Sequence, residues 1–419
     1  MGMVNMVMVG SVGEHAVSGI SLVETINFLF VTTFTALATG GAVVASQYIG
    51  RGDKKNACIS AHQLIYITIA VSIVFMIPTL AFCRPILRLV YGGIADDVMQ
   101  AAQVYFFITA LTLPFLGLYS AAAALFRSMG NSAITMRTAL IVNIVNIVGN
   151  MFFIFVLKIG VAGPALATLI GRFMAAFILI FLLVRGNSGI VNLRGISRIH
   201  FEPYMIKRIL NVGIPSGMEG SMFQFGKILI ARIFTHFGTV AIAANAVATV
   251  INSMGFMAGN AFGLALVTVA GQCIGAGDYR RTKLYTRKII TATYLFYFII
   301  NINIFVFRVP LTELFNLSPE ANKMALSFLM LHCFSATLFW ALAFSLPQAL
   351  KAAGDARYVM IVAVTTMWTF RIGASFILAF PLGLGPIGVW LAMGLDFILR
   401  SIFFTARWLK GSWMKKRVI

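Results

Sequence analysis

Glu219 is an acidic residue inside a long apolar segment at residues 207–235. At 1.5 Å of helical rise per residue, it lies about 18 Å from the start of that segment, near the middle of a hydrocarbon layer roughly 30 Å thick. A charged group at this depth is costly and usually functional. Because burial and exposure to water change its affinity for cations, a carboxylate here could bind and release H⁺ or Na⁺. Glu219 is therefore our first candidate for a site that couples the binding of H⁺ or Na⁺ to the work of the protein. The alternative is that Glu219 forms a structural ion pair.

Two further residues in apolar segments could take part in coupling. Glu24 follows the first turns of the segment 17–49, and His332 lies within 321–350 at a depth similar to that of Glu219. A histidine can take up a proton near neutral pH, but a lone histidine on an apolar helix is commonly a packing residue. We retain Glu24 and His332 as the second and third candidates for cation or proton coupling.

Arg371 and Asp396 have opposite charges and similar depths in the last two apolar segments, which a short loop joins. Opposite charges attract strongly in a medium of low dielectric constant. We predict a structural ion pair between them, with a role in gating as the alternative. Gln224, Asn245 and Asn252 could offer oxygens to a cation or join helices by hydrogen bonds. Asn146 and Asn150 belong to a polar stripe at helical spacing, which must face protein or water, so we predict that it lines the interior of the N-terminal half.

No pattern typical of an enzyme or a metal site accompanies these residues. The run from Gly220 to Ile228 imitates a phosphate-binding loop, but it has five residues between its glycines and ends in isoleucine rather than Ser or Thr. The four cysteines show no metal-ligand spacing. We therefore expect no enzyme activity, no cofactor and no metal, so that any transport has to draw on an ion gradient.

The elements that position these residues are predicted to be helices. The chain of 419 residues is 60% hydrophobic and 11% charged, against roughly 45–50% and about 25% in soluble domains. Long apolar stretches between short basic loops indicate an all-α polytopic membrane protein. We predict twelve transmembrane helices, at 1–12, 17–49, 61–83, 100–126, 133–157, 161–184, 207–235, 241–271, 287–308, 321–350, 358–381 and 386–409.

The net charge of +20 is concentrated on one side of this topology. Basic residues gather in loops at 50–60, 185–208 and 277–288 and in a tail at 410–419. By the positive-inside rule, these loops and the C-terminus are cytoplasmic. We expect no nucleic-acid binding, because no basic face gathers near stacking aromatics or a recognition helix.

The chain repeats itself. Residues 46–53 return at 271–278, an offset of 225, with glycines and an aspartate in the same order. Such glycines are typical of helix ends and of close helix packing. An even number of helices in each copy makes both copies face the same way. We predict an N-terminal lobe at 1–185, a cytoplasmic linker at 186–206 and a C-terminal lobe at 207–409, each lobe a bundle of six helices.

The first predicted helix is truncated. Residues 1–12 would extend about 18 Å, which is too short for a hydrocarbon layer of roughly 30 Å. By the repeat, this helix matches the one that begins near Lys207, so its start would precede Met1. We expect the N-terminus of the given sequence to be incomplete.

Short motifs follow one another along the whole chain. They are Met8-Val9-Gly10 with Gly13, residues 47–53, Gly213-Ile214-Pro215, Ala243-Ala244-Asn245, Arg371, Gly388-Val389-Trp390 with Asp396, and Arg407 with Gly411-Ser412-Trp413. Each motif is weak alone. In order and spacing, however, the set resembles the multidrug and toxic compound extrusion (MATE) family over essentially the whole chain.

The resemblance implies an antiporter in a bacterial inner membrane that exports organic, mostly cationic, compounds in exchange for H⁺ or Na⁺. Its partners would be small amphipathic cations and the lipid bilayer, and we expect a monomer. Substrate would bind between two lobes that rock to alternate access. The chain departs from the family pattern twice: Asn5 stands where many members carry an aspartate, and the tenth helix has no carboxylate. Both departures favour Glu219 as the residue that couples ion movement to export.

Two other functions remain open. A flippase for lipid-linked sugars would share a related fold, but it needs several arginines for a pyrophosphate, and Arg172 is one of few candidates. A degenerate copy that does not transport would account for Asn5 and for the short first helix.

Overall fold

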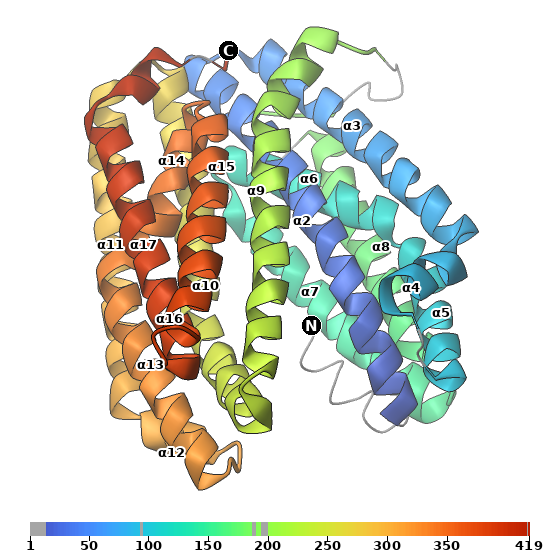
Figure 1. Cartoon of the computed structure of the whole chain (residues 1–419). Coiled ribbons are helices and arrows are strands. Elements are labelled where there is room, and N and C mark those ends of the chain that lie inside the picture. The colour runs from blue at the N-terminus through green and yellow to red at the C-terminus, as the bar shows by residue number, and fades with distance from the viewer. Residues whose placement is uncertain (1–13, 93–94, 187–189, 194–199, 417) are drawn as a thin grey trace. The chain divides into compact units, whose positions relative to one another are not determined.

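The computed structural model describes residues 14–92, 95–186, 190–193, 200–416 and 418–419 (Figure 1). These residues form helices and no β-strand. In the first part of the chain the helices are α2 (Glu14–Arg51), α3 (Lys54–Ala81), α4 (Cys83–Tyr91), α5 (Asp96–Ala110), α6 (Leu113–Ser128), α7 (Ser132–Met151), the π-helix η1 (Phe152–Val156) and α8 (Ala162–Arg185).

The second part begins with α9 (Pro203–Thr235), which enters from the region between the two sequence repeats. The helices that follow are α10 (Gly238–Gly275), α11 (Tyr279–Val306), α12 (Arg308–Glu313), α13 (Pro319–Trp340), the π-helix η2 (Ala341–Ser345), α14 (Leu346–Ala352), α15 (Ala356–Thr365), the π-helix η3 (Thr366–Gly373), α16 (Ala374–Ala379), α17 (Gly385–Leu409) and the 3₁₀-helix η4 (Ser412–Lys415).

Many of these helices match the length and composition of membrane spans. Within the described residues, nine helical segments are long and apolar enough to cross a bilayer, and the bent pair α5 and α6 would make a tenth. Helix α9 is not among them, because its polar and charged residues lower its hydropathy. The predicted all-α polytopic membrane fold is therefore confirmed. The first predicted helix, at 1–12, lies outside the described residues.

The chain divides into two compact units. The N-terminal unit comprises Met1–Ala45 and Asp53–Gly213, and the C-terminal unit comprises Ser46–Gly52 and Ile214–Ile419. Two of the three boundaries fall inside long helices, α2 and α9, and the third lies in the turn between α2 and α3. The described residues of the predicted linker, 186, 190–193 and 200–206, fall within the N-terminal unit.

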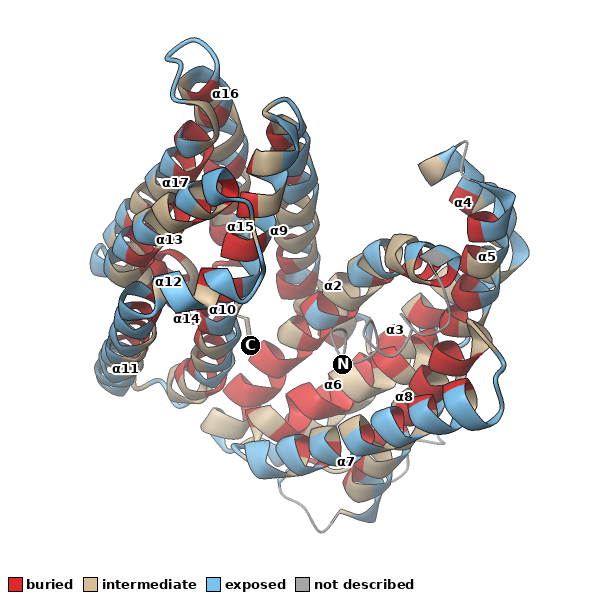
Figure 2. Ribbon diagram, turned by 90° about the horizontal axis from the view of Figure 1, so that it is seen from below, coloured by how far each residue is buried: buried red, intermediate tan, exposed pale blue. Residues whose placement is uncertain are grey.

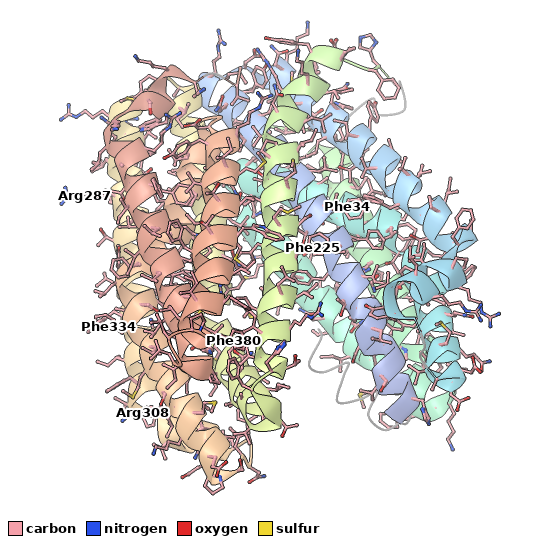
Figure 3. The ribbon with its side chains drawn as sticks, in the orientation of Figure 1. Phe34, Phe225, Arg287, Arg308, Phe334 and Phe380 are labelled. Carbon is pink, nitrogen blue, oxygen red and sulfur yellow. The ribbon has the colours of Figure 1, made fainter. Side chains whose placement is uncertain are left out.

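Large apolar side chains cover the outward faces of several helices, as expected where lipid replaces water. On α11, Leu295 and Phe298 are 61% and 54% exposed, and Figure 2 shows α11 and α7 largely in the colour of exposed residues. Phe334 of α13 projects from the C-terminal unit, with Arg287 and Arg308 towards opposite ends of that unit (Figure 3). An exposed apolar belt is typical of a membrane-spanning bundle.

The sequence repeat is a structural repeat. Helices α2 and α10 each have 38 residues, and α3 and α11 each have 28. Between the members of each pair, Gly52 and Gly277 take φ values of +79° and +75°, which glycine adopts without a Cβ penalty. Asp53 and Asp278 then cap the next helix by accepting a hydrogen bond from a backbone N–H three residues on. The predicted helix stops and turns are thus confirmed.

Some predicted spans are less regular than the sequence suggested. The predicted span at 100–126 is two helices, α5 and α6, bent by 48°. Pro114 lies in the first turn of α6, where its missing N–H and its ring favour a new helix start over continuation. The predicted spans at 321–350 and 358–381 are interrupted by the π-helices η2 and η3. Such interruptions are frequent at functional sites.

Two glycines allow the ends of α2 and α10 to touch within the C-terminal unit. A Cβ added to Gly50 would lie 1.9 Å from the carbonyl oxygen of Gln272, and one added to Gly275 would lie 1.9 Å from that of Gln47. The contact is reciprocal, as the repeat requires. Both partners are backbone atoms, so neither can move aside as a flexible side chain would.

We expect Gly275→Ala to lower the stability of the protein strongly, because the added methyl group overlaps a carbonyl. Overpacking commonly costs about 1–3 kcal/mol, and a backbone overlap lies at or above the upper end. The measurement is the melting temperature of the purified protein in detergent. Gly394→Ala in α17 is the matched control, since its added Cβ would come no closer than 3.6 Å to a neighbour. Equal melting temperatures for the two variants would contradict the close crossing.

Candidate functional site: an aromatic cavity and three carboxylates

A cavity of about 330 Å³ lies wholly within the C-terminal unit. Its volume is in the range of small-molecule sites. Its walls come from α9, α10, α11, α13, η2, η3 and α17, and most of the lining side chains are aromatic or aliphatic. The aromatic members are Phe223, Phe234, Phe256, Tyr297, Trp340, Phe344, Trp390 and Phe397.

The rings of the aromatic wall are closely packed. The rings of Tyr297 and Trp340 stack with centroids 4.4 Å apart, and those of Trp340 and Phe344 stack at 5.2 Å. A Cβ on Gly259 would come within 2.1 Å of the Trp340 ring, so this glycine makes room for the indole. Stacked and edge-on ring pairs add about 0.5–1.5 kcal/mol each beyond burial.

The π-helices bring two of the lining residues to the cavity. Phe344 belongs to η2 and Arg371 belongs to η3. A π turn inserts an extra residue and thereby changes the direction of the side chains that follow it. Periodicity at 3.6 residues per turn therefore cannot place these two side chains correctly.

Arg371 shares one carboxylate with a second arginine. Arg371 Nη1 lies 3.5 Å from Asp396 Oδ2, and Arg400 Nε lies 2.7 Å from Asp396 Oδ1. Asp396 is fully buried, and Arg400 also donates a hydrogen bond to the carbonyl of Ala363. The structure thus brings Arg371 and Asp396 together. The shorter contact, however, is made by Arg400, which follows Asp396 by one helical turn.

Lys227 adds a further positive charge to the cavity wall. It lines the cavity from α9, and it forms no ion pair with any residue that the structure describes. The cavity wall and the residues directly behind it therefore carry three basic groups and one carboxylate. The three are Lys227, Arg371 and Arg400, and the carboxylate is Asp396.

Four polar side chains of the cavity wall have no hydrogen-bond partner among the described residues. They are Asn252 through both amide atoms, Tyr297 through its hydroxyl, His332 through Nδ1 and Trp390 through Nε1. Asn252, Tyr297 and Trp390 are all more than nine-tenths buried. Because an unsatisfied buried polar group costs about 1–3 kcal/mol, a set of four around one cavity indicates that a ligand or water completes it.

Glu219 does not line the cavity. Its Oε2 lies 2.7 Å from Lys351 Nζ, and the two side chains are 19% and 8% exposed. Lys351 comes from α14, beside a loop in which Asp355 binds Arg407 at 2.7 Å. The structure therefore gives Glu219 a cationic partner. This is the structural ion pair that we named as the alternative to a coupling role.

Glu24 lies in a polar cluster of the N-terminal unit. Its Oε1 accepts hydrogen bonds from the Tyr105 hydroxyl at 2.8 Å and from the Asn27 amide at 3.3 Å. Arg172 is near enough to interact with the charge of Glu24, while its guanidinium donates to the Thr112 hydroxyl at 2.5 Å. The Glu24 side chain remains exposed. Two neutral donors thus hold this carboxylate, and the charge of Arg172 acts on it, but Glu24 forms no ion pair with any residue that the structure describes.

The predicted polar residues fall into three groups. Asn245, Asn252 and His332 line the C-terminal cavity together with Arg371. Asn146 and Asn150 are buried in the N-terminal unit, where the Asn150 amide donates to Asn146 and the Asn146 amide donates to Thr168 at 3.4 Å. Gln224 is half-buried on α9 and does not line the cavity. No group of three or more His, Cys, Asp or Glu side chains is placed to hold a metal, within the residues described.

Sequence reasoning missed Lys351, Tyr297 and Trp390, and it left Arg400 out of the predicted ion pair. The signal for Arg400 was its spacing of four from Asp396 on one helix. Lys351 occupies the place in the repeat that Arg127 holds in the first copy. Trp390 stands in the motif Gly388-Val389-Trp390, but the motif does not indicate a cavity, and nothing in the sequence distinguishes Tyr297 from a lipid-facing aromatic residue.

A family model named MatE matches residues 1–152 and 215–377. These ranges cover most of the chain and include parts of both repeats. The chain belongs to the MatE family. Members of this family are membrane transporters, so the chain is not an enzyme.

Curated relatives align with the MatE chain along nearly its whole length. A protein named probable multidrug resistance protein NorM, from Thermotoga maritima, is 24% identical over 100% of this chain and 90% of its own. An uncharacterized transporter, YisQ, from Bacillus subtilis is 25% identical over 99% of this chain and 91% of its own.

Solved structures share the fold. One is a MATE protein in a bent conformation, with a TM-score of 0.91 and 18% identity over 99% of this chain and 91% of its own. Another is a MOP superfamily transporter from Pyrococcus furiosus, described as having a binding pocket of reverse polarity, with a TM-score of 0.91 and 18% identity over 99% and 92%. At this identity the likeness establishes the fold of the MatE chain and nothing further.

Proposed function

We propose that this MatE chain is a cation-coupled antiporter that exports amphipathic organic compounds by alternating access. Family membership and relatives named for multidrug resistance support export of organic compounds. The structural repeat supports alternating access, because paired bundles commonly rock about a shared site. H⁺ and Na⁺ are the two candidate coupling ions.

We propose Glu24 as the coupling carboxylate, and the observation that carries this proposal is its contact set. Neutral donors from Tyr105 and Asn27 hold the side chain, and it is exposed. An ion can therefore bind and leave without breaking a buried ion pair. Protonating Glu219, in contrast, would leave the buried ammonium of Lys351 without its partner, and breaking a buried pair costs several kcal/mol.

The cationic substrates implied by the family resemblance have support in the N-terminal unit only. There, Glu24 offers an exposed carboxylate to a positive charge. In the C-terminal cavity the balance of charge is opposite, with Lys227 and Arg371 on the wall. We therefore include cationic compounds in the proposed substrate range without assigning them to that cavity.

The proposed activity is tested by dye transport in proteoliposomes that contain the full chain. Ethidium movement is followed by fluorescence under a pH gradient alone, under a sodium gradient alone and without a gradient. We expect one of the two gradients to drive transport several-fold above the rate without a gradient. A coupled antiporter uses the downhill movement of one ion across the membrane to drive the uphill movement of the other solute. Equal rates under all three conditions would contradict coupled export.

A further inference from the structure

The charge of the C-terminal cavity is unusual for a site that would hold a cation. Lys227 stands on the wall without a carboxylate partner among the described residues, and Arg371 shares its only one with Arg400. A cationic ligand would meet a net positive charge from the exposed Lys227 and from Arg371 and Arg400. The side chains of the two arginines are only 13% and 3% exposed, so their repulsion acts at low dielectric, where it is strong. An anionic ligand would meet attraction instead.

The unpartnered polar groups of the wall also favour an anion. The indole N–H of Trp390 can only donate a hydrogen bond, and the hydroxyl of Tyr297 and the amide nitrogen of Asn252 can each donate one. All three groups are buried and unpaired within the described part of the chain. Hydrogen bonds to a charged acceptor are about twice as strong as neutral ones, so a carboxylate would satisfy these donors well.

The apolar part of the ligand is indicated by the rest of the wall. Stacked rings of Tyr297, Trp340 and Phe344 form one continuous aromatic surface. Flat aromatic rings pack on such a surface with little loss of conformational freedom. The cavity of about 330 Å³ suits a molecule that has a single ring or two fused rings and a small charged group.

We propose that the C-terminal cavity binds an aromatic monoanion, with its carboxylate at Lys227 and its rings against the aromatic wall. This inference rests on the proposed function, because it assigns a substrate class to one cavity of the transporter. It differs from the family resemblance, which implied cations.

The test compares three probes that share a naphthalene ring: 1-naphthoate, 1-naphthylmethylammonium and 1-naphthalenemethanol. Binding to the purified full-length protein in detergent is measured by equilibrium dialysis, without any ion gradient. We expect the parent protein to bind naphthoate at least about 10-fold more tightly than the ammonium compound, since one charge-assisted contact is worth about a factor of ten or more. Equal affinities for the two, or tighter binding of the ammonium compound, would overturn the inference.

Variants of Lys227 locate the anion. Lys227→Gln should weaken naphthoate binding about 10-fold and leave the neutral alcohol within about 3-fold, while Lys227→Arg should keep naphthoate binding. Arg232→Gln is the matched control, because Arg232 is on the same helix and does not line the cavity. Unchanged naphthoate binding by Lys227→Gln would overturn the assignment. If the protein still prefers naphthoate but shows no gradient-driven dye transport, only the proposed antiport is contradicted.

Discussion

A Glu24→Gln protein is expected to lose gradient-driven dye transport by at least about 10-fold while binding and folding remain close to those of the parent. Glutamine has nearly the shape of glutamate, and its carbonyl oxygen can still accept from Tyr105 and Asn27. It cannot release a proton or balance the charge of Na⁺. A factor of ten corresponds to about 1.4 kcal/mol of lost coupling. The measurement is the initial rate of ethidium transport in proteoliposomes under the gradient that drives the parent.

The control for this prediction is Glu320→Gln, the same chemical change at an exposed position in the first turn of α13. Its transport rate should stay within about twofold of the parent rate, because surface substitutions away from a site usually have small effects. Melting temperatures in detergent should agree for both variants and the parent. Coupled transport by Glu24→Gln at the parent rate would remove Glu24 from the mechanism.

Replacing Lys351 with methionine is expected to lower the stability of the protein by about 3–5 kcal/mol, the usual cost of breaking a buried ion pair. The substitution leaves the Glu219 carboxylate, only 19% exposed, without its partner at 2.7 Å. The double variant Glu219→Gln with Lys351→Met should recover most of this loss, since no charge is then left buried. The measurement is the midpoint of unfolding in detergent for the parent, both single variants and the double variant.

Lys323→Met is the matched control, because Lys323 is exposed on α13 and forms no ion pair within the described residues. Its stability should change by less than about 0.5 kcal/mol. Gradient-driven transport by the double variant decides the role of Glu219. Transport near the parent rate would support a structural pair. A stable double variant without coupled transport would return the coupling role to Glu219, as the sequence first suggested.

Much of the fold could be predicted from local signals. Gly52 with Asp53, and Gly277 with Asp278, indicated where long helices end, and the structure has these turns at positive φ. The break between α5 and α6 was missed, although Pro114 marks it. The segment around Pro114 is apolar throughout, and the hydropathy of a sequence window does not indicate where a helix bends.

The candidate site was predictable only in part. Arg371 and Asp396 could be matched by depth and sign, and the structure brings them to 3.5 Å. The partner of Glu219 could not be predicted, because the depth of Glu219 along α9 does not indicate which residue of α14 lies opposite. The π turn in η3 also shifts Arg371 away from the face that regular helical spacing assigns to it.

The sequence by itself determined that this protein is a helical membrane protein built from two copies of one unit. Hydropathy, basic loops and glycine turns act over a few residues, so they can be read along the chain. Only the tertiary structure decided which charges are paired and which polar groups surround a cavity. Lys227, Asn252, Tyr297 and Trp390 come from four different helices, and their common environment arises from packing between segments that are distant in sequence.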